Sequence, residues 1–117
     1  MTLPVYDKGF TQEEIDFGFE QFVRLVNEKI AKHYREKFPT LSPRRVTVNS
    51  RGRVYWKLVS EADGAHSSVY CFVRKEDGAV LKAASWKAPA LNHARSFVTD
   101  TDYGMSGVGV YGAAYMI

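Results

Sequence analysis

With 117 residues, of which 45% are hydrophobic and 25% charged, the chain has the size and composition of one globular domain, which excludes two separate cores and wholesale disorder. One cysteine excludes an internal disulfide, and no apolar stretch approaches the ~20 residues that a membrane-spanning helix needs. The net charge of +3 hides a basic block between residues 31 and 57, in which Glu36 is the single anion. Such a block is typical of a surface for a polyanion, and also of solvated helix ends and turns.

The first element along the chain is a long helix, which we expect over residues 11–38. Thr11 and Glu14 have the spacing of a capping box, and Pro39 disfavours helix at the residue before it. Gly18 costs the helix up to ~1 kcal/mol, so we expect it to mark a close backbone approach. Apolar residues recur at helical spacing in a stripe that Phe17, Val23, Leu25 and Tyr34 widen: Ile15, Phe19, Phe22, Val26 and Ile30.

Four strands are expected next, as an antiparallel meander over residues 44–84. Alternating segments at 45–49, 53–60 and 67–75 are separated by short turns that contain glycine, and a further turn at 76–78 precedes the last strand. The expected pairs on the apolar face are Val46 with Trp56, Trp56 with Cys71, Leu58 with Val69, and Leu81 with Val73. The sequence therefore predicts an α+β fold in which the helix covers the apolar face of a four-stranded sheet.

The other face of this sheet interleaves cations with aromatic side chains. Single-stranded nucleic acids are bound by cations that track the phosphates and by rings on which bases stack, each stacked base being worth ~1–3 kcal/mol. The arginine and lysine residues Arg35, Lys37, Arg44 and Arg51 would form a rim. The candidate nucleic-acid-binding residues on the face itself are Arg45, Arg53, Tyr55, Lys57, Tyr70, Phe72, Arg74 and Lys82.

Residues 85–117 form an irregular segment rich in glycine and tyrosine. Within it, residues 90–98 are compatible with a short helix that begins after Pro89. The apolar ending is expected either to pack across the open sheet face or to add a strand at a sheet edge. In the first case the aromatic side chains of that face would belong to a second core instead of a binding surface.

Catalytic and metal-binding constellations are not evident. His33, His66 and His93 have no partners at metal-ligand or catalytic spacing, and Cys71 at an inward strand position is expected to act as a small hydrophobic residue. Asp100 and Asp102 have a spacing that closes turns more often than it binds metals. We therefore expect neither an enzyme nor a cofactor.

The last third of the chain carries a resemblance. Residues 84–90, with the sequence Ala-Ser-Trp-Lys-Ala-Pro-Ala, are followed by Asn92, Ala94-Arg95, Gly107 and the run from Tyr111 to Tyr115. This pattern resembles the ending of small, uncharacterised proteins encoded by bacteriophages. The resemblance implies a viral or prophage origin and the bacterial cytoplasm as the place of action, which agrees with a start that lacks the features of a signal peptide.

Two functions follow as hypotheses. The first is a non-enzymatic protein that binds nucleic acid, single-stranded and with weak sequence specificity, through the basic and aromatic sheet face. The alternative is a phage-type protein-interaction module, such as an inhibitor of a host factor, an assembly or virion protein, or a homo-oligomer, because tyrosine and arginine are also favoured at protein interfaces.

Overall fold

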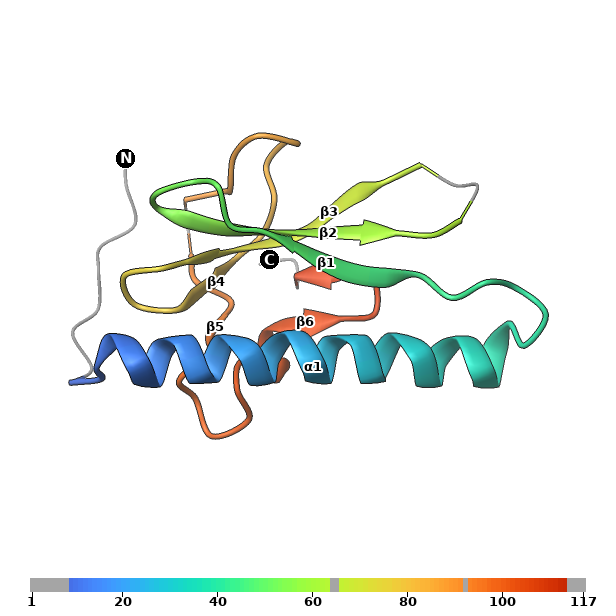
Figure 1. Cartoon of the computed structure of the whole chain (residues 1–117), viewed down its shortest axis with the longest axis horizontal. Helices are drawn as coiled ribbons and strands as arrows, with labels where there is room; N and C mark the ends of the chain where they lie inside the picture. The colour runs from blue at the N-terminus through green and yellow to red at the C-terminus, as the bar shows by residue number, and fades with distance from the viewer. Residues whose placement is uncertain (1–8, 64–65, 92, 114–117) are drawn as a thin grey trace.

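The computed structural model describes residues 9–63, 66–91 and 93–113. The chain forms one long helix and a five-stranded antiparallel sheet, which confirms the α+β class and adds one strand to the expected four. Figure 1 shows the helix beneath the sheet. The sheet follows chain order from β1 to β5, and a short 3-10 turn and a two-stranded hairpin follow it. The elements are α1 (Gln12–Lys37), β1 (Arg45–Asn49), β2 (Tyr55–Glu61), β3 (Ser68–Arg74), β4 (Ala79–Leu81), β5 (Ser96–Phe97), η1 (Met105–Gly107), β6 (Val108–Gly109) and β7 (Gly112–Ala113).

The start and end of α1 are as the local sequence predicts. The Glu14 amide donates to Thr11 Oγ1 at 3.2 Å, and the Thr11 amide donates to Glu14 Oε1 at 3.0 Å, so the capping box is complete. At the other end the amide of Phe38 donates to the carbonyl of Tyr34 at 2.8 Å. All five residues of the central apolar stripe are buried, whereas Phe17 remains 54% exposed and does not join that core.

Gly18 marks a close backbone approach, as expected. A Cβ at this position would lie 2.3 Å from the carbonyl oxygen of Val98, which follows β5. Only glycine leaves room for that contact. The helix is therefore pressed against the chain just after β5, and this contact positions the loop that follows.

The first two hairpins keep the predicted faces with shifted registers. Trp56 lies opposite Val73 and Leu58 opposite Cys71, two residues from the expected pairing, and Val46 lies opposite Ser60 instead of Trp56. Both shifts are even, so Trp56, Leu58 and Cys71 stay on the predicted apolar face, whereas Val69, beyond the bulge, packs on the outer face. A bulge between Leu58 and Val59 breaks the alternation and turns Tyr70 into the core beneath the sheet.

The predicted register between β3 and β4 is wrong by one residue. Val80 lies opposite Val73 and Leu81 opposite Phe72, because the turn at 75–78 has four residues and closes with the Gly78 amide on the Arg74 carbonyl. An odd shift moves every side chain of β4 to the other face. Leu81 therefore packs with Phe72 on the side of the sheet that faces away from the helix.

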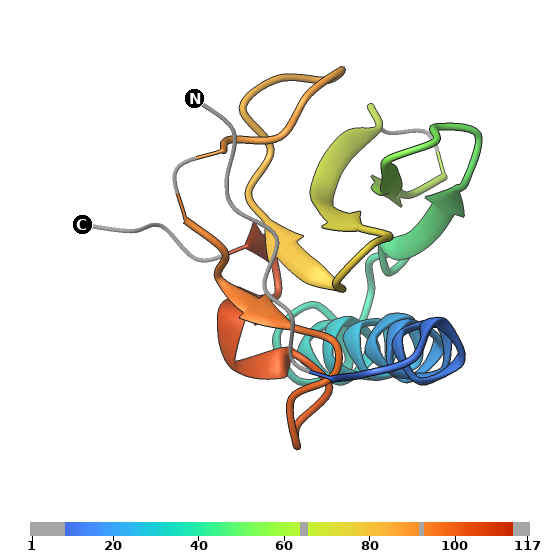
Figure 2. The same ribbon diagram turned by 90° about the vertical axis from the view of Figure 1, so that its left-hand side faces the viewer.

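That outer face is covered, and the cover is the segment between β4 and the end of β5. The expected helix at 90–98 is wrong, because residues 96–97 instead pair with β4, with Phe97 opposite Ala79 and Ser96 opposite Val80. Figure 2 shows the chain rising away from the helix after β4 before it returns to β5. Leu91, Ala94 and Phe97 pack on Phe72, Ala79 and Leu81 as a second, smaller core.

The described part of the tail follows neither of the two expected courses. Residues 105–113 lie on the helix side, where Val108 is buried in the main core and the Tyr70 hydroxyl donates to the carbonyl of Gly109. The strands β6 and β7 pair with each other and not with the large sheet. The run from Ala114 to Ile117 lies outside the described residues.

Candidate functional site

Three of the eight predicted binding residues are buried, so their assignment to an open surface was wrong. Tyr70, Phe72 and Arg74 are each 3% exposed. Tyr70 turns inward at the bulge and Phe72 lies beneath the segment after β4. Arg74 forms a bidentate pair with Asp77, with Nε and Nη2 at 2.9 and 2.6 Å from the two carboxylate oxygens, and this hydrogen bonding raises the pKa of Arg74.

Two more of the predicted residues lie away from the others. Arg45 is exposed at the start of β1, where its guanidinium lies 3.8 Å from the carboxylate of Asp63. Lys82 is half-buried beyond the end of β4 and donates to the Ala83 carbonyl. The sheet face is therefore not one continuous platform.

The remaining three, Arg53, Tyr55 and Lys57, line one cleft of about 340 Å³. It opens between the β1–β2 loop and the loop after β4, and Arg51 and Lys87 line it as well. No aspartate or glutamate is among its lining residues. Four cations thus surround one hollow with no carboxylate in its wall to neutralise them, which produces a locally positive potential.

Aromatic rings form the floor of this cleft. The rings of Tyr55 and Phe72 meet edge to face, with centroids 6.0 Å apart and an interplanar angle of 72°. Tyr55 is half-buried, whereas Phe72 belongs to the outer core and holds Tyr55 from below. Phe72 is therefore too deeply buried to contact a ligand, but it supports the ring of Tyr55, which a ligand would contact.

Trp86 provides a second ring beside the cleft. It is 51% exposed, and the Nζ atom of Lys57 lies 3.7 Å from its ring centroid, a cation–π contact worth ~0.5–1 kcal/mol at an exposed site. The loop that carries it is closed, because the amides of Ala84 and Ser85 both donate to the carbonyl of Ala88. An exposed tryptophan in a closed loop is consequently held in place before any ligand arrives.

The opposite wall of the cleft is also fixed by hydrogen bonds. Lys75 Nζ donates to the carbonyls of Ser50 and Gly52 at 2.9 and 2.7 Å, and the Arg51 amide donates to the side chain of Asn49 at 3.0 Å. These bonds position the backbone of the β1–β2 loop. The side chains of Arg51 and Arg53 remain exposed on it.

The sequence interpretation missed Trp86 and Lys87 as members of this site. Both lie in a segment without periodicity, and only the return of the chain to β5 brings them beside β2. A signal was present all the same, since an adjacent tryptophan and lysine between Ser85 and Pro89 have no partners in a strand or helix pattern. Of the rim residues, Arg44 serves the fold, because it donates to Ser60 and to the carbonyl of His66.

Asp100, Asp102 and Cys71 have structural roles. Asp100 accepts a hydrogen bond from the Phe97 amide, and Asp102 accepts from the amides of Gly104 and Ser106, as expected for turn-closing carboxylates. Burial raises the pKa of the Cys71 thiol. Across residues 9–63, 66–91 and 93–113 no group of three or more metal-binding side chains comes together. Within the same ranges, α1 is too polar to cross a bilayer.

Comparison with known proteins places most of this chain in one family. The model of a family described as a family of unknown function, DUF7717, matches residues 11–106. That range contains α1, the complete five-stranded sheet and every residue that lines the cleft. No curated protein and no solved structure matches the chain.

Proposed function

This chain belongs to DUF7717, a family of unknown function, and we propose that it binds single-stranded nucleic acid with little sequence preference through the cleft between the β1–β2 loop and the loop after β4. One observation carries the proposal: four cations and no carboxylate surround a hollow with an aromatic floor, beside an exposed tryptophan. Positive grooves with stacking rings are the common means of binding single strands.

Each part of the cleft has a role in this proposal. Arg51, Arg53 and Lys87 contact phosphates from the two walls, while a base stacks on the face of Trp86 that Lys57 leaves open. Tyr55 offers a second, half-buried ring. A duplex keeps its bases stacked on one another, so it can use the cations but not the rings, and this difference favours single strands.

Salt dependence provides the first test. Fluorescence anisotropy of a labelled single strand of ~30 nucleotides would be recorded at several salt concentrations, with a duplex of equal length for comparison. Each phosphate contact in a single strand contributes about −0.7 to the slope of log K against log salt, so the three cations assigned to phosphates give a slope of about −2. A slope near zero, or no binding at low salt, would refute the proposal.

Charge reversal then locates the contacts. Arg53→Glu with Lys87→Glu should weaken binding by about tenfold or more and flatten the slope by about 1.4, because two phosphate contacts are lost. The matched control is Lys29→Glu with Lys32→Glu, which makes the same change in net charge on the exposed side of α1, away from the cleft and its expected rim. Equal losses in both variants would show that only net charge matters and that the cleft is not the site.

Stacking is tested at Trp86. Trp86→Ala should reduce affinity for the single strand by about fivefold or more, the equivalent of ~1–3 kcal/mol per stacked base, and leave duplex binding nearly unchanged. Trp86→Phe keeps a ring and should retain most of the affinity. Similar losses for the single strand and the duplex would contradict a stacking role.

The source and place of action remain part of the proposal. On the resemblance of residues 84–115 to phage proteins, we infer a bacteriophage or prophage origin and the bacterial cytoplasm as the site of action. The alternative function, a protein-interaction module, is tested by the same samples. A stable dimer in size-exclusion chromatography that binds no oligonucleotide would favour the alternative.

A further inference from the structure

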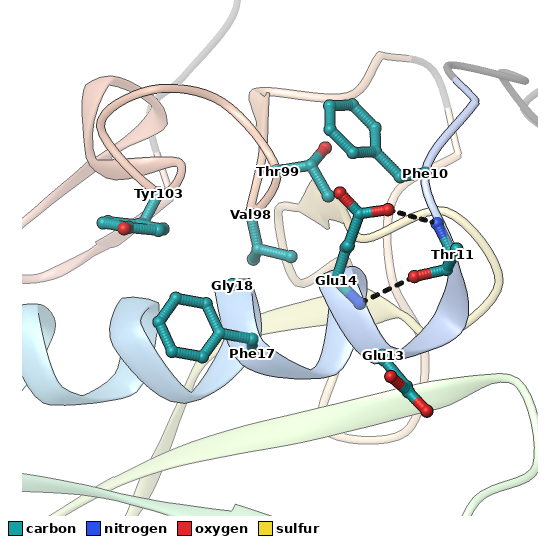
Figure 3. A pocket seen from close by; sticks show the side chains of 9 residues that line it. All are labelled: Phe10, Thr11, Glu13, Glu14, Phe17, Gly18, Val98, Thr99 and Tyr103. Atoms are coloured by element: carbon teal, nitrogen blue, oxygen red, sulfur yellow. Dashed lines mark hydrogen bonds between the residues drawn. The ribbon is translucent and has the colours of Figure 1, made fainter.

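A second hollow, of about 360 Å³, lies where the first turns of α1 meet the loop after β5 (Figure 3). Phe17 and Tyr103 stand at one end of it and Phe10 at the other, with Val98 between them. Phe10 and Phe17 are 43% and 54% exposed. Three rings from two stretches of chain, residues 10–18 and 98–103, therefore border one open groove, which we call the acidic groove for the carboxylates described next.

The charges of this groove are opposite to those of the cleft. Glu13 and Glu14 line it, and no lysine or arginine does. The carboxylate of Glu14 accepts a hydrogen bond from the Thr11 amide, and Glu13 forms no ion pair with any residue of the described ranges. The helix N-terminus adds about half a positive charge, which two carboxylates outweigh. The groove is therefore negative as well as aromatic.

Tyr103 is held in this position against its own backbone preference. Its φ angle is 55°, and the left-handed region costs a residue with a side chain ~1–2 kcal/mol. The turn is fixed around it, because its amide donates to the Asp100 carbonyl at 2.9 Å and Asp102 accepts from the Gly104 amide at 3.1 Å. The result is an edge-to-face contact with Phe17, with centroids 6.2 Å apart. Strained residues of this kind are concentrated at ligand sites.

We propose that the acidic groove binds an arginine or lysine side chain presented by an exposed segment of a partner protein. Ring faces attract cations, and adjacent carboxylates strengthen this preference over an uncharged apolar group. The volume of about 360 Å³ lies at the low end of the roughly 300–1,000 Å³ of ligand sites, so it suits one side chain. The aliphatic stem would lie on Val98 and the charged head beside the rings and the two carboxylates, of which Glu14 points toward the hollow in Figure 3. The inference is independent of the cleft, which binds an anion.

The test uses the full-length protein labelled with ¹⁵N and the blocked peptide Gly-Gly-Arg-Gly-Gly as the probe. We expect saturable chemical-shift changes at residues 10–18 and 98–104, with a dissociation constant on the order of millimolar. The same peptide with citrulline, which has the shape of arginine without its charge, should bind at least about tenfold more weakly. Equal shifts from the two peptides, or none that saturate, would overturn the proposal.

Variants separate the groove from general acidity. Phe17→Ala and Glu13→Gln should each weaken binding of the arginine peptide several-fold, and both positions are exposed enough for the fold to persist. Glu20→Gln, an exposed position on α1 that does not line the groove, should leave binding unchanged. If Glu20→Gln weakens binding as much as Glu13→Gln, the attraction is not specific to the groove and the proposal fails.

The chain's own Lys8 is the other possible source of a cation, since it precedes Phe10 by two residues. If Lys8→Gln strengthens binding of the arginine peptide about tenfold or more, the groove is filled by its own chain and the partner assignment is wrong. Unchanged binding in this variant supports a partner. Guanidinium ion alone should bind more weakly than the peptide, and equal binding would overturn the assignment to a side chain on a polypeptide.

Discussion

The pair of Arg74 and Asp77 provides the most informative perturbation of the fold, because sequence and structure assign Arg74 opposite roles. On the outer sheet face Arg74 would be an open phosphate contact, whereas the structure buries both side chains to 3% exposure. Asp77 Oδ1 accepts from Arg74 Nε at 2.9 Å and from the Ala79 amide at 3.1 Å, and Oδ2 lies 2.6 Å from Arg74 Nη2. Asp77→Ala removes all of these bonds and leaves a buried guanidinium.

The magnitude follows from that burial. Removing one partner of a buried ion pair costs about 3–5 kcal/mol, because the buried charge of Arg74 loses the carboxylate that binds it through two hydrogen bonds. With an unfolding entropy of about 2.1 cal/mol/K per residue, a chain of 117 residues has about 0.25 kcal/mol/K at its melting temperature. A loss of about 4 kcal/mol should therefore lower Tm by about 16 °C.

Circular dichroism melts and urea titrations measure this loss, and an exposed ion pair serves as the control. Asp63→Ala removes the ion-pair partner of Arg45. Because the side chains of Asp63 and Arg45 are both largely open to solvent, this change should lower the free energy of unfolding by less than about 1 kcal/mol and Tm by less than about 4 °C. If Asp77→Ala changes Tm no more than Asp63→Ala does, Arg74 is not buried and the covered outer face described above is incorrect.

Three further perturbations follow from single contacts. Gly18→Ala should lower the free energy of unfolding by about 1–3 kcal/mol, since the new Cβ would lie 2.3 Å from the Val98 carbonyl oxygen. Helix propensity alone predicts a more stable protein, so a higher Tm would refute the contact. Asn27 forms hydrogen bonds with both the amide and the carbonyl of Val46 at the open edge of β1. Asn27→Ala should therefore lower the free energy of unfolding by about 1–2 kcal/mol and promote self-association that light scattering detects. A variant that is monodisperse and equally stable would contradict this role. Burial raises the pKa of Cys71, so above about pH 8.5 the thiol loses its proton in the unfolded state but keeps it in the folded state, and the free energy of unfolding should fall by up to ~1.4 kcal/mol per pH unit. In urea titrations over a pH series, Cys71→Ala should flatten this alkaline fall. A profile that is unchanged in the variant would count against the burial of the thiol.

The candidate site was predictable only where it depends on local alternation. Arg53, Tyr55 and Lys57 follow one another along the entry to β2, and Arg51 was expected at the rim, so this wall of the cleft could be read from spacing alone. The other wall could not, because Trp86 and Lys87 reach the cleft through a loop that is closed by backbone hydrogen bonds without any periodic pattern. The acidic groove escaped prediction for the same reason, since it joins residues 10–18 to a turn some 80 positions away.

By itself the sequence determined the helix and the class of the fold. Capping residues, helical spacing and Pro39 act within a few residues of one another, so α1 begins, turns its stripe inward and ends where they predict. The tertiary structure alone decided which side chains stay at the surface. Phe72 and Arg74 alternate like outward residues of an open sheet, yet Phe72 is buried by Leu81 of the shifted β4 and by Leu91, Ala94 and Phe97, and Arg74 is buried together with Asp77. Burial of a sheet face depends on what packs over it, and that is set by contacts between distant segments and not by the alternation of the strand itself.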